Sequence, residues 1–497
     1  MLSKITSFAL DGLDGVPVEV ETDINKGMVS YDLVGLPDAA VKESKERVRS
    51  AIKNSGFVFP VNKITVNLAP ADLKKAGSHY DLPLAVSILV ASDQLAATDF
   101  VLLGELALDG ALRPVKGMLQ LLISARDRGC KKFIIPADNA SEAGYISGVT
   151  VYALPSLKAV TELISGVKEF EPVVLKRYIA KRAYGSDMSL VRGQRVAKRA
   201  LEIAVAGGHN ILLAGSPGSG KTMLARCVPT IMPDMTFEEA LEVTKIHSVA
   251  GEVGGDGIVA QRPFRTPHHT ASTVSLCGGG SGHVSPGEIS KAHKGVLYLD
   301  ELPEYSRATL EALRQPLEDR VITVTRAAGA VAFPADFILC ASMNPCPCGN
   351  YGSAYLECTC TPSQIQRYRS RVSGPLLDRI DLQVEVDGVK YDELSSDGAE
   401  ECSAAVKERV ERAREIQRKR CGSVNALMDE RQIKRYCRLS AECEAILKTA
   451  FESLRLSARA RSRIIKVART VADLGGCENI APEHILEAVS YRAMDTK

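Results

Sequence analysis

Apolar and polar residues follow two different periods along about the first 165 residues of the chain. Short runs typical of β-strands occupy residues 16–22, 64–68 and 132–135. Runs with apolar residues at helical spacing cover residues 39–53, 82–92 and 117–128. This mixture predicts an N-terminal α+β or α/β domain, which we assign to residues 1–168.

The apolar run at residues 211–214 leads directly into a glycine-rich turn, which in turn leads into a helix. The turn has the pattern G-x-x-x-x-G-K-T and consists of Gly215, Ser216, Pro217, Gly218, Ser219, Gly220, Lys221 and Thr222. Its three glycines are expected to take positive φ values, so that successive N–H groups point at phosphate oxygens at a helix N-terminus. We expect Lys221 to reach the β- and γ-phosphates and Thr222 to hold Mg²⁺.

A second half of the same site follows farther along the chain. Residues 295–299 have the pattern of a buried strand, and Asp300 and Glu301 come directly after it. In this Walker B arrangement the first acid holds the metal and the second activates the attacking water. The two halves together predict an ATPase with ATP and Mg²⁺ as cofactors, in which Thr222 and Asp300 bind the metal.

Asn344 and Arg379 are candidates for two further catalytic roles. Asn344 ends the apolar run 337–343 and is placed like the sensor that orients the attacking water, although Asn is also common in caps and turns. In a closed ring, Arg379 would reach the γ-phosphate bound by the neighbouring subunit. The alternative for Arg379 is an intrachain salt bridge to Asp378 or Asp381.

The region after residue 403 is predicted to be helical. Residues 404–420 become basic toward their end, and residues 454–474 repeat apolar side chains at helical spacing. Arg459 lies near the start of a segment with several cations and is our candidate for a second sensor that contacts the γ-phosphate from this lid. The alternative is a solvated basic face.

These motifs divide the rest of the chain. A charged, irregular stretch at residues 169–190 is predicted to be a linker. It precedes an α/β ATPase core with a parallel sheet at residues 191–391 and a helical lid at residues 392–497. Within the core, alternating runs on both sides of residues 327–329 predict a β-hairpin with Arg326 near its tip, which is a candidate DNA contact.

A glycine-rich segment, residues 251–293, lies between the two halves of the nucleotide site. In a ring it would either face the central pore or form a structural hairpin. It contains His268 and His269, for which solvated or hydrogen-bonded roles are favoured over metal binding, because adjacent side chains diverge.

Four cysteines come shortly after Asn344. They span fifteen residues and form two C-x-C pairs: Cys346, Cys348, Cys358 and Cys360. Four thiols in this order could hold a tetrahedral Zn²⁺, although C-x-C is tighter than the usual C-x-x-C. The alternative is a group of free or redox-active thiols.

Composition limits the remaining possibilities. The chain has 497 residues, of which 45% are hydrophobic, so two to four domains can each bury a core. No apolar run approaches a membrane span, and we therefore expect a cytoplasmic protein without a membrane partner. The net charge of +2 means that any binding to nucleic acid depends on local basic patches.

The N-terminal region resembles the Lon-protease fold in the stretches 63–72, 77–85 and 104–114. A Lon-type protease needs a Ser nucleophile and a Lys of lowered pKa. Leu84 and Leu119 stand at the corresponding positions, so the resemblance implies a catalytically dead domain that serves as a scaffold or binding surface. Ser78 and Lys116 lie nearby in the sequence, but a relocated dyad is disfavoured.

Over nearly its full length the chain resembles the ComM/YifB family of Mg-chelatase-like AAA+ ATPases. The resemblance rests on G-S-P-G-S-G-K-T, L-Y-L-D-E-L, S-M-N-P-C-P-C-G and G-P-L-L-D-R-I-D, together with the N-terminal domain. It implies a homohexameric, ATP-driven DNA motor, a helicase or translocase that supports branch migration during natural transformation. Single-stranded and branched DNA would be its partners, together with other recombination proteins.

Two other functions share parts of this pattern. The ATPase subunit of a magnesium chelatase, which drives metal insertion through partner subunits, would have the same ATPase core. An ATP-dependent protease is disfavoured by Leu84 and Leu119.

Overall fold

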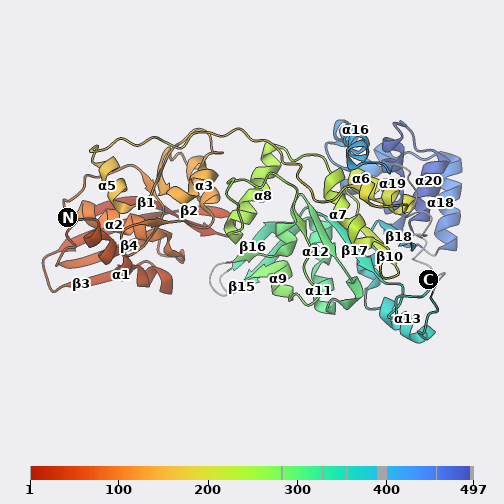
Figure 1. Ribbon diagram of the computed structural model, residues 1–497, viewed down its shortest axis with the longest axis horizontal. Helices are drawn as coiled ribbons and strands as arrows, with labels where there is room; N and C mark the ends of the chain where they lie inside the picture. Colours follow the sequence, from red (N-terminus) through yellow and green to blue (C-terminus); the bar gives the residue numbers. More distant parts are fainter. Residues whose placement is uncertain are drawn as a thin grey trace.

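The computed structural model describes residues 2–280, 284–326, 329–352, 356–388, 400–454 and 456–492. Figure 1 shows three regions in succession along the long axis: an N-terminal region in red to orange, a central region in green, and a helical region in blue. The mixed α/β fold with a parallel sheet and a helical C-terminal region confirms the predicted fold class. None of the described helices has the length and apolar character needed to cross a membrane.

The first N-terminal sheet has the strand order β1-β2-β4-β3. β1 (Leu2–Asp11) and β2 (Asp14–Asn25) form an antiparallel hairpin, β4 (Lys63–Ala69) pairs antiparallel with β2, and β3 (Ser30–Val34) runs parallel to β4. Buried and exposed positions alternate along β4, so one face of the sheet is apolar. Helix α2 (Asp81–Ala91) packs on β1 and β2, and α1 (Ala39–Asn54) packs on α2.

A second, parallel N-terminal sheet has the order β5-β8-β9. Its strands are β5 (Val101–Leu102), β8 (Lys132–Pro136) and β9 (Thr150–Leu154). A short antiparallel pair and three helices complete the region: β6 (Glu105–Leu106), β7 (Leu112–Arg113), α3 (Met118–Asp127), α4 (Ala140–Ala143) and α5 (Leu157–Ile164). The strands and helices predicted here from the sequence are confirmed.

The positions that a Lon-type dyad would need lie in the apolar core of this region. Leu84 on α2 and Leu119 on α3 are both fully buried. The Ser78 hydroxyl donates a hydrogen bond to Glu105, whereas the Lys116 side chain lies against Gly251 in the central region. Ser78 and Lys116 thus have different neighbours, which gives no support to a relocated dyad.

The central region is built on a five-stranded parallel sheet with the order β11-β14-β17-β10-β18. The strands are β10 (Ile211–Gly215), β11 (Phe264–Arg265), β14 (Val296–Leu299), β17 (Ile338–Met343) and β18 (Leu382–Val386). β14 and β17 are buried at every position, because helices cover both faces of such a sheet. The helices of the region are α6 (Arg195–Gly207), α7 (Lys221–Ile231), α8 (Phe237–Ala250), α11 (Arg307–Ala312), α12 (Arg314–Asp319), α13 (Pro362–Arg369) and α14 (Gly374–Leu377).

The predicted hairpin is present as β15 (Val321–Arg326) and β16 (Gly329–Pro334), with Arg326 opposite Gly329. Residues 327–328 and the Arg326 side chain, the candidate DNA contact, lie outside the described residues. The hairpin packs against the β1–β2 turn so closely that a Cβ on Gly12 would lie 2.6 Å from Val331 Cγ1. It therefore joins the central region to the N-terminal region.

Besides β11, the described residues of the glycine-rich segment 251–293 contain four short elements: α9 (Thr273–Cys277), the antiparallel pair β12 (Gly278–Gly279) and β13 (Ser285–Pro286), and α10 (Glu288–Lys291). An ion pair between Arg265 and Glu288, at 2.6 Å, closes the segment on itself. The His247 side chain of α8 is bonded to the Lys291 carbonyl at 3.1 Å. These contacts hold the segment against α8 and against itself, and both its pore-facing and its structural alternatives stay predictions.

The C-terminal region consists of α16 (Ser403–Cys421), α17 (Glu430–Tyr436), α18 (Ala441–Ser453), α19 (Ala458–Leu474) and α20 (Pro482–Ser490). α16 packs on α6, α7 and α19. The apolar run at 454–474 is not helical from its start, because Ser457 caps α19 by accepting the Ala460 N–H at 3.2 Å. Residues 165–187 contain no helix or strand, and the proposed boundary between core and lid at residues 391 and 392 lies outside the described part of the chain.

Candidate nucleotide site

The P-loop connects the end of β10 to the start of α7 at Lys221. Gly218 and Gly220 have φ values of 78° and 90°, in the region that favours glycine. Gly215 does not share this conformation, so the expectation of positive φ at all three glycines is wrong there. Gly215 is required for a different reason, since a Cβ would lie 2.2 Å from the Val386 carbonyl oxygen at the end of β18.

Lys221 points back into the P-loop. Its ammonium donates hydrogen bonds to the carbonyl oxygens of Gly215 and Ser216, at 2.7 and 2.8 Å, and to Asn344 Oδ1 at 3.3 Å. Asn344 directly follows β17, the neighbour of β10 in the sheet, and carboxyl ends of parallel strands meet at one edge. Burial lowers the pKa of Lys221. The structure thus brings Asn344 to the P-loop, while its role as a sensor stays a prediction.

Thr222 and Asp300 face each other across the same edge of the sheet. Thr222 Oγ1 lies 3.3 Å from Asp300 Oδ2 and 3.3 Å from the Tyr298 hydroxyl. The Ser342 hydroxyl of β17 donates a hydrogen bond to the other Asp300 oxygen. Asp300 is therefore oriented by Thr222 of α7 and by Ser342 of β17, with one oxygen toward Thr222, as a shared metal ligand requires.

Glu301 lies beside Asp300 in a left-handed backbone conformation with φ of 51°. Its N–H donates to Ser342 Oγ at 3.3 Å, which fixes the backbone, while its side chain remains 51% exposed. His269 Nδ1 lies 3.6 Å from Glu301 Oε2. Nothing in the sequence connects His269 with Glu301, because the two residues are far apart in the chain and no motif links them.

The residues at this edge fit a Mg²⁺-bound nucleoside triphosphate. The Ser219 hydroxyl is buried and has no hydrogen-bond partner among the described residues. A Cβ on Gly218 or Gly220 would meet nothing within 4 Å, so the turn is open on that side. An open turn of backbone N–H groups at a helix N-terminus, with a buried ammonium and an unpartnered hydroxyl, is suited to a polyanion.

Arg379 is not near these groups. Its guanidinium is 8% exposed, donates to the Pro375 carbonyl at 2.8 Å, and forms an ion pair with Glu318 on α12. The expected alternative partners were Asp378 and Asp381, but the ion pair is with Glu318. Asp381 is instead paired with Arg463 at 2.5 Å.

Arg459 is exposed on the first turn of α19. It lines a hollow of about 580 Å³ together with Glu318, the ion-pair partner of Arg379. Within the described residues, no P-loop residue belongs to that lining. Arg459 therefore shares this hollow with the ion-pair partner of Arg379, and not with the described P-loop residues.

The four cysteines also come together. The Sγ atoms of Cys346, Cys348, Cys358 and Cys360 all lie within 4.8 Å of one another. Cys346 follows Asn344 by two residues, so this cluster adjoins the nucleotide site.

A parallel sheet with the order β11-β14-β17-β10-β18, a P-loop after β10, two acids after β14 and a helical lid define an AAA+ P-loop ATPase. Three family models match the chain: "Subunit ChlI of Mg-chelatase" over residues 20–139, "Magnesium chelatase, subunit ChlI" over residues 187–394, and "Magnesium chelatase, subunit ChlI C-terminal" over residues 400–492. The chain belongs to the YifB/ComM family of magnesium-chelatase-like AAA+ ATPases.

Two bacterial relatives match nearly the whole chain, and a third matches part of it. The uncharacterized protein YifB of Escherichia coli is 45% identical over 99% of this chain and 97% of its own length. The competence protein ComM of Haemophilus influenzae is 43% identical over 99% of this chain and 98% of its own length. The magnesium-chelatase 67 kDa subunit of Chlorobaculum parvum is 28% identical, over 31% of this chain and 22% of its own length.

Proposed function

We propose that this protein is an ATP-driven DNA motor that works as a hexameric ring and moves branched DNA. The observation that carries the proposal is a nucleotide site joined to an N-terminal domain in a chain that matches a competence protein over its whole length. Competence concerns the uptake of DNA, so the similarity to a competence protein supports DNA as the substrate.

At the nucleotide site, each of these groups has one task. Lys221 binds the phosphates, and Thr222 and Asp300 hold Mg²⁺, which when bound neutralises phosphate charge. Glu301 takes the proton of the attacking water as general base, and Asn344 orients that water. The exposed Glu301 side chain supports this role, since the base must reach water that enters from outside.

Arg379 and Arg459 act on the nucleotide of the neighbouring subunit. Arg459 lines a hollow together with Glu318, the ion-pair partner of Arg379, and no described P-loop residue lines that hollow, which supports a role in trans for both arginines. Glu318 holds the Arg379 guanidinium until a γ-phosphate from the neighbour competes for it. For Arg459 this changes the expectation of a lid sensor into that of a sensor that reaches across the interface.

Movement at the nucleotide site can be passed to the N-terminal region through α8. The Gly117 N–H, at the start of α3, donates to the Ser248 carbonyl of α8 at 2.9 Å. The Ser248 hydroxyl donates to Glu142 of α4 at 2.6 Å. The hairpin β15–β16 makes a second connection at Gly12. We infer that the N-terminal region positions DNA while the ring moves it.

A magnesium-chelatase ATPase subunit is the second candidate. It is supported by the names of the matching family models, which cover both the N-terminal and central regions. Against it, the chelatase subunit of Chlorobaculum parvum is similar over only 31% of this chain, whereas the competence protein matches 99%.

We expect single-stranded or forked DNA to stimulate ATP hydrolysis by the purified protein about tenfold or more, since a motor couples turnover to its track. The measurement compares initial ATPase rates without DNA, with single-stranded DNA and with duplex DNA at one fixed salt concentration, because phosphate contacts are salt-dependent. Lys221→Ala serves as the background control. Equal rates in all three conditions would contradict a DNA motor and favour the chelatase alternative.

A further inference from the structure

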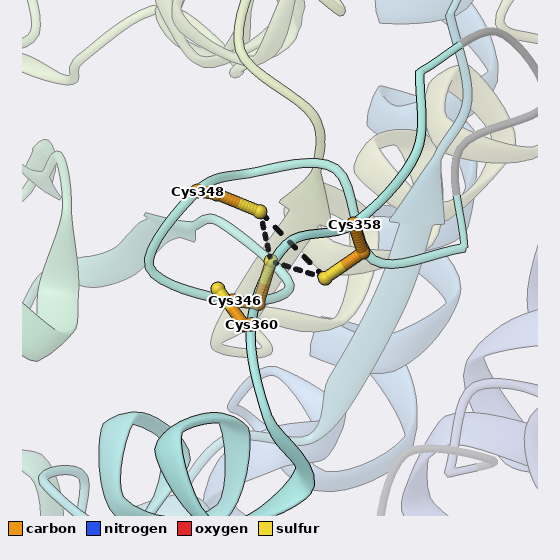
Figure 2. Close-up of side chains that lie close together, drawn as sticks. All are labelled: Cys346, Cys348, Cys358 and Cys360. Atoms are coloured by element: carbon orange, nitrogen blue, oxygen red, sulfur yellow. Dashed lines mark hydrogen bonds between the residues drawn. The ribbon is translucent and has the colours of Figure 1, made fainter.

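The four-cysteine loop forms a compact set of thiols without a disulfide. Figure 2 shows the side chains converging from the two ends of one loop. Cys346 Sγ lies 3.3 Å from Cys348 Sγ and 3.7 Å from Cys358 Sγ, and the last two are 3.6 Å apart. All four are free cysteines, and Cys346 is completely buried.

This arrangement matches a mononuclear tetrathiolate site. With Zn–S bonds of about 2.3 Å, tetrahedral geometry places the sulfur atoms about 3.8 Å apart. The three separations among Cys346, Cys348 and Cys358, from 3.3 to 3.7 Å, lie close to that value, and Cys360 Sγ lies within 4.8 Å of each of these sulfurs. The Tyr351 N–H donates to Cys346 Sγ at 3.3 Å, and such N–H···S bonds stabilise the thiolate form that binds metal. Among divalent metals, a tetrahedral set of four sulfurs is typical of zinc.

The four-cysteine loop adjoins the nucleotide site at two places. It begins directly after Asn344, whose side chain lies 3.3 Å from the Lys221 ammonium. It also touches the P-loop itself, since a Cβ on Gly349 would lie 2.5 Å from Pro217 Cδ. From the other side, Arg369 of α13 donates to the Pro345 carbonyl at 3.2 Å.

We propose that Cys346, Cys348, Cys358 and Cys360 bind one Zn²⁺, and that this zinc holds Gly349 against Pro217 and fixes both the P-loop and Asn344. Among the described contacts, the far end of the loop, at residues 358–360, is tied to the turn that carries Gly349 through the cysteine sulfurs: the Thr359 backbone is hydrogen-bonded to Cys348 Sγ, the Cys348 backbone is hydrogen-bonded to Cys360 Sγ, and Cys348 Sγ lies 3.6 Å from Cys358 Sγ. A metal bound to the four sulfurs would join the two ends of the loop directly. The proposal that these cysteines bind zinc does not depend on the proposed function, whereas the proposal that the zinc positions the P-loop and Asn344 rests on the proposed ATPase function.

The first experiment measures metal content by elemental analysis of protein purified without chelators. We expect about one zinc per chain in the parent protein and in the controls Cys402→Ser and Cys477→Ser, which change exposed cysteines outside the loop. We expect less than about a tenth of that in the double variant Cys346→Ser/Cys358→Ser. Metal-free parent protein that takes up no added Zn²⁺ after reduction, or a site that holds iron, would overturn the zinc assignment.

The second experiment measures the affinity for fluorescent ADP, which needs neither hydrolysis nor DNA. Chelation of zinc from the folded parent protein should weaken ADP binding by about tenfold or more, and added Zn²⁺ should restore it. Circular dichroism before and after chelation shows whether the protein stays folded. Unchanged affinity after complete zinc removal would overturn the positioning role, whatever DNA does to the ATPase rate.

Two glycines offer a matched pair that leaves the ligands intact. Gly349 and Gly352 have φ values of 80° and 79°, but among the described residues a Cβ on Gly349 meets Pro217, whereas a Cβ on Gly352 meets no atom within 4 Å. Both substitutions strain the backbone, but only Gly349→Ala also disturbs the contact with Pro217. The Gly349→Ala variant should therefore keep its zinc and bind ADP about tenfold more weakly than the Gly352→Ala variant. Equal ADP affinities in the two variants would show that the contact with Pro217 does not determine the conformation in which the P-loop binds nucleotide.

Discussion

Replacing Arg379 by Ala should lower ATP hydrolysis by the assembled ring about 10³-fold or more, the range expected when an arginine finger is removed. The guanidinium neutralises charge that develops on the γ-phosphate in the transition state, so turnover should fall far more than nucleotide affinity. The measurement is kcat at saturating ATP, together with sedimentation in ATP to establish that rings form.

A mixing experiment tests whether Arg379 acts in trans. Lys221→Ala lacks phosphate binding and Arg379→Ala lacks the finger, so each is nearly inactive alone. In mixed rings some interfaces pair an intact P-loop with an intact Arg379 from the neighbour, and part of the activity should return. A flat mixing curve with rings present would contradict the trans role.

Glu318 supplies the control that separates catalysis from structure. If Arg379 serves only as its ion-pair partner, Glu318→Gln should reduce turnover about as much as Arg379→Ala, because both break the same pair. If Arg379 is the finger, Glu318→Gln frees the guanidinium and should keep turnover within about threefold of the parent rate.

Glu301→Gln should lower turnover by about 10²-fold or more while nucleotide binding stays intact. The amide keeps the size of the carboxylate but cannot accept the proton of the attacking water. Single-turnover hydrolysis and ATP affinity should be measured together, since the variant is expected to trap an ATP-bound ring.

The matched control for Glu301→Gln is Glu304→Gln, which neutralises an exposed acid three residues away that is paired with Arg371 at 2.8 Å. This variant should hydrolyse ATP at nearly the parent rate. Parent-like turnover in Glu301→Gln itself would mean that another group is the base, and His269 would then be the nearest candidate.

Features encoded in short stretches of sequence were predictable. The P-loop and the acids after β14 each lie within a few residues, and the four cysteines lie within fifteen, so spacing alone predicts that the members of each group come together. The β15–β16 hairpin was predictable because alternation on both sides of a turn is a local pattern. The start of α19 was missed because helical spacing continues through Ser457, and only the cap reveals where the helix begins.

Long-range neighbours could not be read from the sequence. The pairing of Arg379 with Glu318 depends on how α12 packs beside the end of α14, and the sequence offered two nearer acids. His269 reaches Glu301 only because the segment between the two halves of the site folds back. Gly215 is needed for the approach of Val386 from β18, which no local pattern indicates.

Strand movement on a forked DNA substrate tests the proposed motor most directly. Protein is added to a labelled fork or four-way junction with ATP, and strand separation is followed over time, with Glu301→Gln and ADP as the controls without hydrolysis. We expect the parent protein to separate the strands with ATP, and we expect no strand separation in either control. Active ATPase that moves no strand on any branched substrate would contradict the assignment of this protein as a DNA motor.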